Sequence, residues 1–258
     1  MKVLILKSAE LATEAASREI LSLVEAKPDC TLGLATGGTM EPVYAALRQG
    51  AGAISFAGVR SFNLDEYVGL APDHAQSYHR YMAEQLFDHI DIRPENTHVP
   101  RGDAASPNTE ARLFDEAIAA AGGIDLQLLG LGANGHIGFN EPFSSLGSRT
   151  RVKTLTRKTR EDNARLFAEG EEVPTYAITM GVGTIMEARR ILLVATGAHK
   201  ACAVAAMIEG PVSAACPASV LQFHPQATIL LDEGAASALK MRDYYDFVHP
   251  NGQDVDLG

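Results

Sequence analysis

Short apolar runs alternate with amphipathic stretches along most of the chain. Six runs are continuous, of strand length and bounded by turn residues; they are residues 2–6, 31–34, 59–64, 124–132, 191–194 and 227–231. Stretches with helical spacing separate them, at residues 8–26, from about 41, 77–90, 109–123 and 199–210. Continuous apolar strands separated by helices are typical of a parallel sheet covered on both faces. We therefore expect an α/β fold, with an open, mostly parallel sheet and helices on both faces in a Rossmann-like three-layer sandwich.

The first amphipathic stretch, residues 8–26, shows the helical spacing clearly. Leu11, Ala15, Ile20 and Val24 fall near one face of a helix. We expect these four side chains to form the apolar face of this helix.

Length and composition are those of an ordinary globular chain. The 258 residues are 46% hydrophobic and 21% charged, and no linker, repeat or low-complexity tract interrupts them. We therefore expect a single domain, residues 1–258. No apolar run approaches the roughly 18 residues of a membrane span, and the apolar start is too short for a signal peptide, so we expect a cytoplasmic protein that binds no membrane.

The three cysteines are Cys30, Cys202 and Cys216, and they are scattered along the chain. An odd number without C-x-x-C spacing argues against a disulfide framework or a zinc ribbon. Each is expected to be a small buried hydrophobic residue.

The formal net charge of −10 argues against a nucleic-acid surface, which needs a basic patch to meet phosphates. Residues 149–160 differ from the acidic chain as a whole, because they include six basic residues and no acidic one. This run is a local positive site suited to a small anion, or equally a solvated basic face.

Polar or glycine-rich loops follow four of the predicted strands. These loops are residues 35–39, 64–67, 132–142 and 196–200. Ligands of open parallel sheets gather at the carboxyl ends of strands, so we expect these loops to form one composite site.

Two nucleotide-binding motifs fail on their context. Gly130–Gly135 satisfies G-x-G-x-x-G, but Pro142 soon follows and Lys153, not an acidic residue, lies about twenty positions on. Residues 36–39 lack the G-K-[ST] of a Walker loop. We reject both interpretations.

A phosphate cradle is the better interpretation of Thr36, Gly37, Gly38 and Thr39. They lie between a strand and a helix start, where backbone N–H groups and the helix dipole favour an anion. Lys200 follows another strand and could add a cation. The alternatives are a tight turn that requires glycine and a solvated lysine.

Acid–base chemistry is indicated at two of these loops. Asp65 and Glu66 are adjacent, and their repulsion can raise one pKa and make a general base, although a capping role is the alternative. His136 shares its loop with Asn134 and Glu141, which favours proton transfer over a purely structural histidine. Neither H-x-x-x-H nor H-E-x-x-H occurs, so we expect no metal.

Four segments together resemble the glucosamine-6-phosphate deaminase (glucosamine-6-phosphate isomerase) family. They are LATGGT, FNLDEYVGL, GANGHIGFNEP and SRTRVKTLT, in the family's order, within a resemblance that runs from Leu32 to near Leu230. The resemblance implies conversion of glucosamine 6-phosphate and water to fructose 6-phosphate and ammonia, in amino-sugar catabolism and without a cofactor. The physiological direction stays open, because ammonia and metabolite levels set it.

The resemblance also implies roles for individual residues. Asp65 matches the general base that moves a proton between C2 and C1, and His136 matches the histidine that opens the sugar ring. Glu141 and Asn134 match the residues that orient and tune His136; an amide at 134 can orient the ring but cannot share a negative charge with it. The residues matching the substrate-phosphate site are Thr36, Gly37, Gly38, Thr39, Arg165 and Lys200.

An effector site is implied by the same family. Some members are hexamers activated by N-acetylglucosamine 6-phosphate, and the residues matching that site are Ser144, Arg151, Lys153 and Thr154. Residues 142–185 would then form a lid and effector segment. The family's effector tyrosine aligns with Tyr245 or Asp246, and shorter members are unregulated monomers, so allostery and a homo-oligomer stay open.

Two alternatives belong to other functional classes. A related sugar-phosphate isomerase or a 6-phosphogluconolactonase-like hydrolase would share the phosphate turn but not both FNLDEY and NGHIGFNEP. A non-catalytic sugar-phosphate sensor would have little reason to keep Asp65, His136 and Glu141 together.

Overall fold

A seven-stranded parallel sheet forms the centre of the protein. The computed structural model describes residues 1–52, 54–165, 167–168 and 170–253. The strand order is β1-β10-β9-β6-β2-β3-β5, and neighbouring strands pair in parallel. The strands are β1 (Lys2–Leu6), β2 (Thr31–Leu34), β3 (Arg60–Asn63), β5 (Thr97–His98), β6 (Leu126–Gly130), β9 (Arg190–Ala195) and β10 (Ala227–Asp232).

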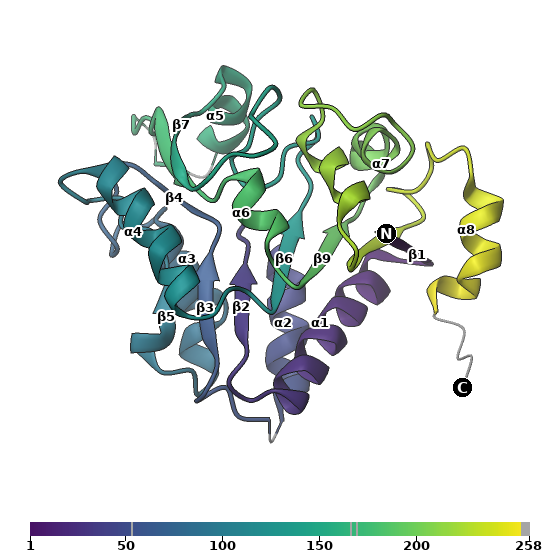
Figure 1. The fold of residues 1–258 in the computed structure, drawn as a ribbon, viewed down its shortest axis with the longest axis horizontal. Helices are drawn as coiled ribbons and strands as arrows, with labels where there is room; N and C mark the ends of the chain where they lie inside the picture. The colour runs from purple at the N-terminus through teal and green to yellow at the C-terminus, as the bar shows by residue number, and fades with distance from the viewer. Residues whose placement is uncertain (53, 166, 169, 254–258) are drawn as a thin grey trace.

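Helices pack around this sheet (Figure 1). They are α1 (Ala9–Ala26), α2 (Met40–Ala51), α3 (Tyr78–Gln85), α4 (Pro107–Ala120), α5 (Arg157–Ala164), α6 (Val182–Met186), α7 (Ala201–Ile208) and α8 (Arg242–Val248). Short 3-10 turns are η1 (Phe87–His89), η2 (Pro94–Asn96), η3 (Ala198–Lys200), η4 (Pro217–Phe223) and η5 (Pro250–Gly252).

The predicted fold class is confirmed, and each of the six predicted strands is present. The predicted face of the first helix is only half right. Ile20 and Val24 are buried, but Leu11 is 40% exposed and the core positions of α1 are Ala12 and Ala16. Positions 12, 16, 20 and 24 repeat every four residues, so small alanines, and not the larger Leu11, face the sheet.

A second, three-stranded sheet was not predicted. It is antiparallel, in the order β4 (Asp65–Tyr67), β8 (Tyr176–Thr179) and β7 (Arg151–Thr154). Leu64 joins the two sheets: its N–H donates to Leu34 O (3.0 Å), and its own carbonyl accepts from the N–H of Met180 (2.7 Å). In Figure 1 the arrows of β2, β3, β6 and β9 run upward, and β7 and α5 lie above the carboxyl ends of the sheet.

The strand order reverses between β2 and β6. From β2 the chain proceeds outward through β3 to β5, and from β6 it proceeds the other way through β9 to β10, which pairs with β1 at the edge. Such a reversal opens a crevice outside the carboxyl ends of the two strands. The loops that follow β2 and β6 are residues 35–39 and 131–142, which carry the predicted phosphate turn and the predicted acid–base loop.

The cysteine prediction needs one correction. Each of the three is a free thiol, and Cys30 is buried, but Cys202 is exposed and Cys216 is partly buried. Cys202 lies on the outer side of α7, whose buried positions include Ala201, Ala203 and Val204. Within the described ranges, no helix combines the length and the apolar character that crossing a bilayer requires.

Candidate active site

A cavity of about 280 Å³ lies at the β2–β6 reversal. Asp65 and His136 both line it, together with the turn of residues 36–39 and Lys200. The structure therefore brings together, in one cavity, side chains and turns from four separate strand ends. The remaining lining residues are Ala35, Met40, Leu64, Tyr78, Gly130, Leu131, Gly132, Ala133, Gly138, Phe139, Thr159 and Asn163.

The turn between β2 and α2 forms one end of the cavity. Gly37 has φ +109°, a conformation that glycine adopts without strain, and its carbonyl accepts hydrogen bonds from Met40 N–H (2.8 Å) and Tyr81 OH (3.0 Å). Thr39 caps α2 without a side-chain hydrogen bond. The positive end of the α2 dipole thus lies at this turn, an arrangement that favours an anion.

Arg165 lies against a different cavity from Asp65. A second cavity of about 430 Å³ shares Gly38, Thr39 and Lys200 with the first and is also lined by Arg165 and His199. Arg165 is not among the residues that line the first cavity. Five of the six predicted phosphate residues, Thr36 to Thr39 and Lys200, therefore line the first cavity. The sixth, Arg165, lines the second cavity, which adjoins the first at Gly38, Thr39 and Lys200.

Asp65 is a buried carboxyl at the start of β4, with 5% of its surface exposed. Burial, and then the neighbouring charge of Glu66, raise the pKa of Asp65 to about 7, while the Thr179 hydroxyl and the Phe139 N–H act in the opposite direction. Thr179 Oγ1 donates to Asp65 Oδ2 at 3.4 Å. A carboxyl with this pKa exchanges protons readily near neutral pH.

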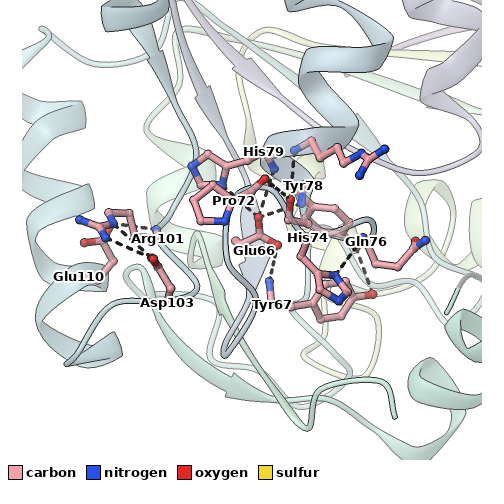
Figure 2. A network of polar contacts seen from close by, with 12 residues as sticks. Glu66, Tyr67, Pro72, His74, Gln76, Tyr78, His79, Arg101, Asp103 and Glu110 are labelled. Carbon is pink, nitrogen blue, oxygen red and sulfur yellow. Dashed lines mark hydrogen bonds and ion pairs between the residues drawn. The ribbon is translucent and has the colours of Figure 1, made fainter. Parts of the chain in front are cut away.

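Glu66 points to the other side of β4, because successive strand residues face opposite ways. It is fully buried. Its Oε1 accepts from the N–H of Tyr67 (2.8 Å), and its Oε2 accepts from the N–H groups of Tyr78 (2.8 Å) and His79 (3.2 Å) and lies 3.1 Å from His79 Nδ1. Figure 2 shows this network at the start of α3. Glu66 is therefore a helix-capping carboxylate, the alternative considered for this pair of acids.

Asn134 connects Glu141 to His136. Its Nδ2 donates to Glu141 Oε2 (2.9 Å), which places its Oδ1 toward His136 Nδ1 (2.7 Å) and the His136 N–H (3.2 Å). Because an amide oxygen only accepts hydrogen bonds, Nδ1 carries a proton and Nε2 is the basic nitrogen of the neutral ring. Glu141 Oε2 also lies 3.7 Å from His136 Nδ1.

Burial by itself would raise the pKa of Glu141, but hydrogen bonds and charge lower it below its usual range. Thr159, Asn134, the charge of His136 and Thr156 together outweigh burial. Glu141 is 2% exposed, with Oε1 accepting from the hydroxyls of Thr156 (3.1 Å) and Thr159. Glu141 is therefore held as a carboxylate.

Two glycines of the loop are required by close approach. A Cβ on Gly132 would lie 2.2 Å from His136 Cε1, so the imidazole lies directly over this backbone. Gly138 has φ +55°, and a Cβ there would lie 3.2 Å from Asp65 Oδ2. The glycines thus allow His136 to fold over the backbone of its own loop and Asp65, from β4, to approach the same loop.

The sequence did not point to several side chains of this site. Tyr78, Thr159 and Asn163 line the cavity, and Thr179 contacts Asp65. They come from α3, α5 and β8, whose packing over the cavity is set by contacts distant in sequence. The only sequence signal was Thr156 preceding Thr159 by three residues, which is a helix-capping pattern.

The predicted effector residues lie largely on one strand. Arg151, Lys153 and Thr154 belong to β7, whereas Ser144 lies in the preceding loop and is 1% exposed. Arg151 Nη1 donates to Asn140 Oδ1 (2.7 Å), and burial lowers the pKa of this guanidinium. Arg149, by contrast, is exposed and pairs at the surface with Asp115 (2.7 Å) and Glu187 (2.5 Å).

Tyr245 and Asp246, the two candidates for the family's effector tyrosine, both lie on α8. Tyr245 is partly buried, and burial, followed by the charge of Glu209, raises the pKa of its hydroxyl, whereas Asp246 pairs with Arg242 at 2.7 Å. Figure 1 shows α8 beside β1, on the side of the molecule away from β7. Within one chain the structure does not bring either residue to β7.

Comparison of structures places the fold among sugar-phosphate enzymes of the α/β class. A structure described as a monomeric glucosamine-6-phosphate deaminase matches with a TM-score of 0.89 and 43% identity, covering 92% of this chain and 100% of that one. A 6-phosphogluconolactonase from Trypanosoma cruzi matches with a TM-score of 0.76 over 93% of this chain and 97% of that one, and at 19% identity it shares the fold alone.

Sequence comparison identifies the family. Residues 7–230 match the family described as glucosamine-6-phosphate isomerases/6-phosphogluconolactonase. A glucosamine-6-phosphate deaminase of Hahella chejuensis is 55% identical over 96% of this chain and 95% of its own length, and one of Shewanella loihica is 54% identical over 98% and 95%. The chain belongs to this family.

Proposed function

We propose that this chain is a glucosamine-6-phosphate deaminase that acts in amino-sugar catabolism. It would convert glucosamine 6-phosphate and water to fructose 6-phosphate and ammonia. The observation that carries the proposal is the single cavity lined by Asp65, His136 and an anion-binding turn. Full-length relatives at 50–55% identity carry the same activity in their names, which supports it.

The proposed reaction begins at the phosphate end. The turn of residues 36–39, with Lys200 beside it, binds the phosphate, and Arg165 approaches from the second cavity. Binding energy at this remote end then positions the sugar carbons against the acid–base groups.

Proton transfers follow at the other end. His136, with Nδ1 protonated, accepts the anomeric hydroxyl proton at Nε2 and returns a proton to the ring oxygen, which opens the ring. Glu141 and Asn134 orient the imidazole. The Asp65 carboxylate removes the proton from C2 of the open chain and returns it to C1, while the aldehyde oxygen gains the proton that the C2 amine gives up. Water then hydrolyses the resulting C2 imine to the ketone and ammonia. No residue in this scheme needs a cofactor.

The location and regulation of the enzyme are further parts of the proposal. We place it in the cytoplasm, as one domain in which residues 142–185 serve as lid and effector segment. N-acetylglucosamine 6-phosphate would bind at Ser144, Arg151, Lys153 and Thr154 in a homo-oligomer. Sedimentation, together with rate curves measured with and without this compound, tests both points; a monomer with unchanged curves contradicts them.

Ammonia release tests the activity. Purified protein and glucosamine 6-phosphate should yield ammonia and fructose 6-phosphate in equal amounts. His136→Gln should slow turnover of the pyranose substrate, and near-normal rates would remove His136 from ring opening. Fructose 6-phosphate without ammonia, or hydrolysis of 6-phosphogluconolactone in its place, would contradict the proposed function.

A further inference from the structure

Helix α5 has no apolar face with which to pack. Its sequence is RKTREDNA, in which Ala164 is the only apolar residue. A helix that is polar all round gains little from hydrophobic burial, so polar contacts must hold it in place. This helix nevertheless contributes Thr159 and Asn163 to the wall of the cavity.

The contacts that hold α5 lead into the proposed active site. At its start, the hydroxyls of Thr156 and Thr159 both bond to Glu141 Oε1. Near its end, Asn163 Nδ2 donates to Tyr67 OH (2.8 Å), and between them Arg160 Nε donates to Val173 O (3.1 Å). Glu141 is thus a main attachment point of the helix.

The two oxygens of Glu141 have separate tasks. Oε2 accepts from Asn134, which in turn sets the tautomer of His136. Oε1 accepts from α5. Among the described residues, His136 is the titratable side chain within ion-pair distance of Glu141, with its Nδ1 at 3.7 Å from Oε2. A shift of α5 would therefore move or release the carboxylate that fixes the imidazole.

Helix α4 begins with the same hydroxyl pair but without the carboxylate. Ser106 and Thr109 stand at its N-cap and third positions, with Thr109 N–H donating to Ser106 Oγ (3.4 Å) and the two hydroxyls 2.9 Å apart. In α5 the corresponding distances for Thr156 and Thr159 are 3.2 Å and 3.1 Å. However, α4 buries Phe114 and Ile118 and does not depend on its cap for attachment.

We propose that Thr159 is a positioning residue for ring opening: its hydroxyl holds Glu141, and through Asn134 the imidazole of His136, in the arrangement that the reaction uses. Thr156 supports it by capping α5 and sharing the same oxygen. This inference rests on the function proposed above.

A double-mutant cycle with Glu141→Gln tests the proposal. Thr159→Val should lower kcat for glucosamine 6-phosphate about tenfold, with KM within about twofold, because a charge-assisted hydrogen bond is lost. Thr159→Ser should restore kcat to within about twofold. Thr109→Val at the matched position of α4 should leave kcat unchanged. In the Glu141→Gln background, Thr159→Val should have no further effect on kcat.

Other outcomes of the cycle overturn the proposal. If Thr159→Val costs the same in both backgrounds, Thr159 acts on the substrate directly or only on folding. The native protein, Thr159→Val, Glu141→Gln and the double variant should also be unfolded thermally without substrate. Thr159→Val should lower Tm by about 2–4 °C in the native background and by less in the Glu141→Gln background. The activity and Tm measurements together separate failure of the proposed function from failure of the contact between Thr159 and Glu141. An inactive native protein defeats the proposed function, whereas additive Tm changes defeat the contact itself.

Discussion

The neighbouring carboxyls of Asp65 and Glu66 lie on opposite sides of strand β4, in different hydrogen-bonding environments. Asp65, on the cavity side, has 5% of its surface exposed and accepts a side-chain hydrogen bond from Thr179 at 3.4 Å. Glu66, on the α3 side, is fully buried and meets three backbone N–H groups and an imidazole nitrogen. Both carboxyls are buried, so the supply of hydrogen-bond donors separates Asp65, the proposed acid–base group, from Glu66, which caps a helix.

The largest expected effect is on catalysis at Asp65. Asp65→Asn should lower kcat by at least about 10³-fold, because an amide cannot accept the C2 proton, while the substrate still binds. Steady-state rates and calorimetric titration with glucosamine 6-phosphate measure the two quantities. Glu66→Gln is the neighbouring control and should retain most of kcat. Equal losses in both variants would erase the distinction between the two sides.

The same substitution should change stability in a pH-dependent way. The folded-state pKa of Asp65, about 7, lies above the roughly 3.9 of an unfolded chain. The folded protein therefore binds this proton more tightly, and the resulting stabilisation is complete below about pH 4 and lost as pH rises to 7. Relative to the native protein, Asp65→Asn should gain unfolding free energy between pH 5 and pH 8, on the order of 3 kcal/mol out of a full effect on the order of 4 kcal/mol. Denaturant unfolding at both pH values measures it, and a pH-independent difference would contradict the raised pKa.

Loss of the α3 cap should mainly affect stability. Glu66→Gln replaces one acceptor oxygen with a donor group facing N–H groups and should cost about 1–3 kcal/mol of unfolding free energy. Glu110 offers a matched control, because it accepts the single N–H of Arg101 in an exposed hydrogen bond (3.0 Å; Figure 2). Glu110→Gln should cost less than about 1 kcal/mol by the same denaturant assay. Similar costs at both positions would count against Glu66 as a buried cap.

The smallest expected effect concerns the hydroxyl that faces Asp65. Thr179 lowers the pKa of Asp65, so Thr179→Val should raise it further. The acid limb of the kcat/KM profile should then move to higher pH, by less than about one unit. Thr179→Ser keeps the hydroxyl and should leave the limb in place; a shift in the serine variant would assign the effect to packing.

Much of the large parallel sheet could be predicted from the local pattern of apolar and polar residues. Strands β2 and β6 are short, mostly apolar runs, and β3 carries Phe62 among polar residues. Each is followed at once by its polar loop, so the order of these strands and the loops at their ends are properties of neighbouring residues. The order of the loops then predicted a shared cavity, since parallel strands end at one edge of a sheet. The small sheet was harder to predict, because β7 and β8 are short and partly polar and lie more than twenty residues apart. Helix α5 could not be inferred from periodicity, because it has no apolar stripe.

By itself, the sequence determined that Asp65 and Glu66 are neighbours, that His136 shares a loop with Asn134 and Glu141, and that glycines allow this loop to approach other groups. Only the tertiary structure decided which carboxyl faces the cavity, since pairing of β4 with β8 sets Asp65 opposite Thr179, more than a hundred residues away. It also decided what holds Glu141, because hydroxyls from a later helix complete its hydrogen bonds. Proximity along a chain follows from covalent connection, whereas burial, hydrogen-bond donors and therefore pKa depend on segments that only folding brings together.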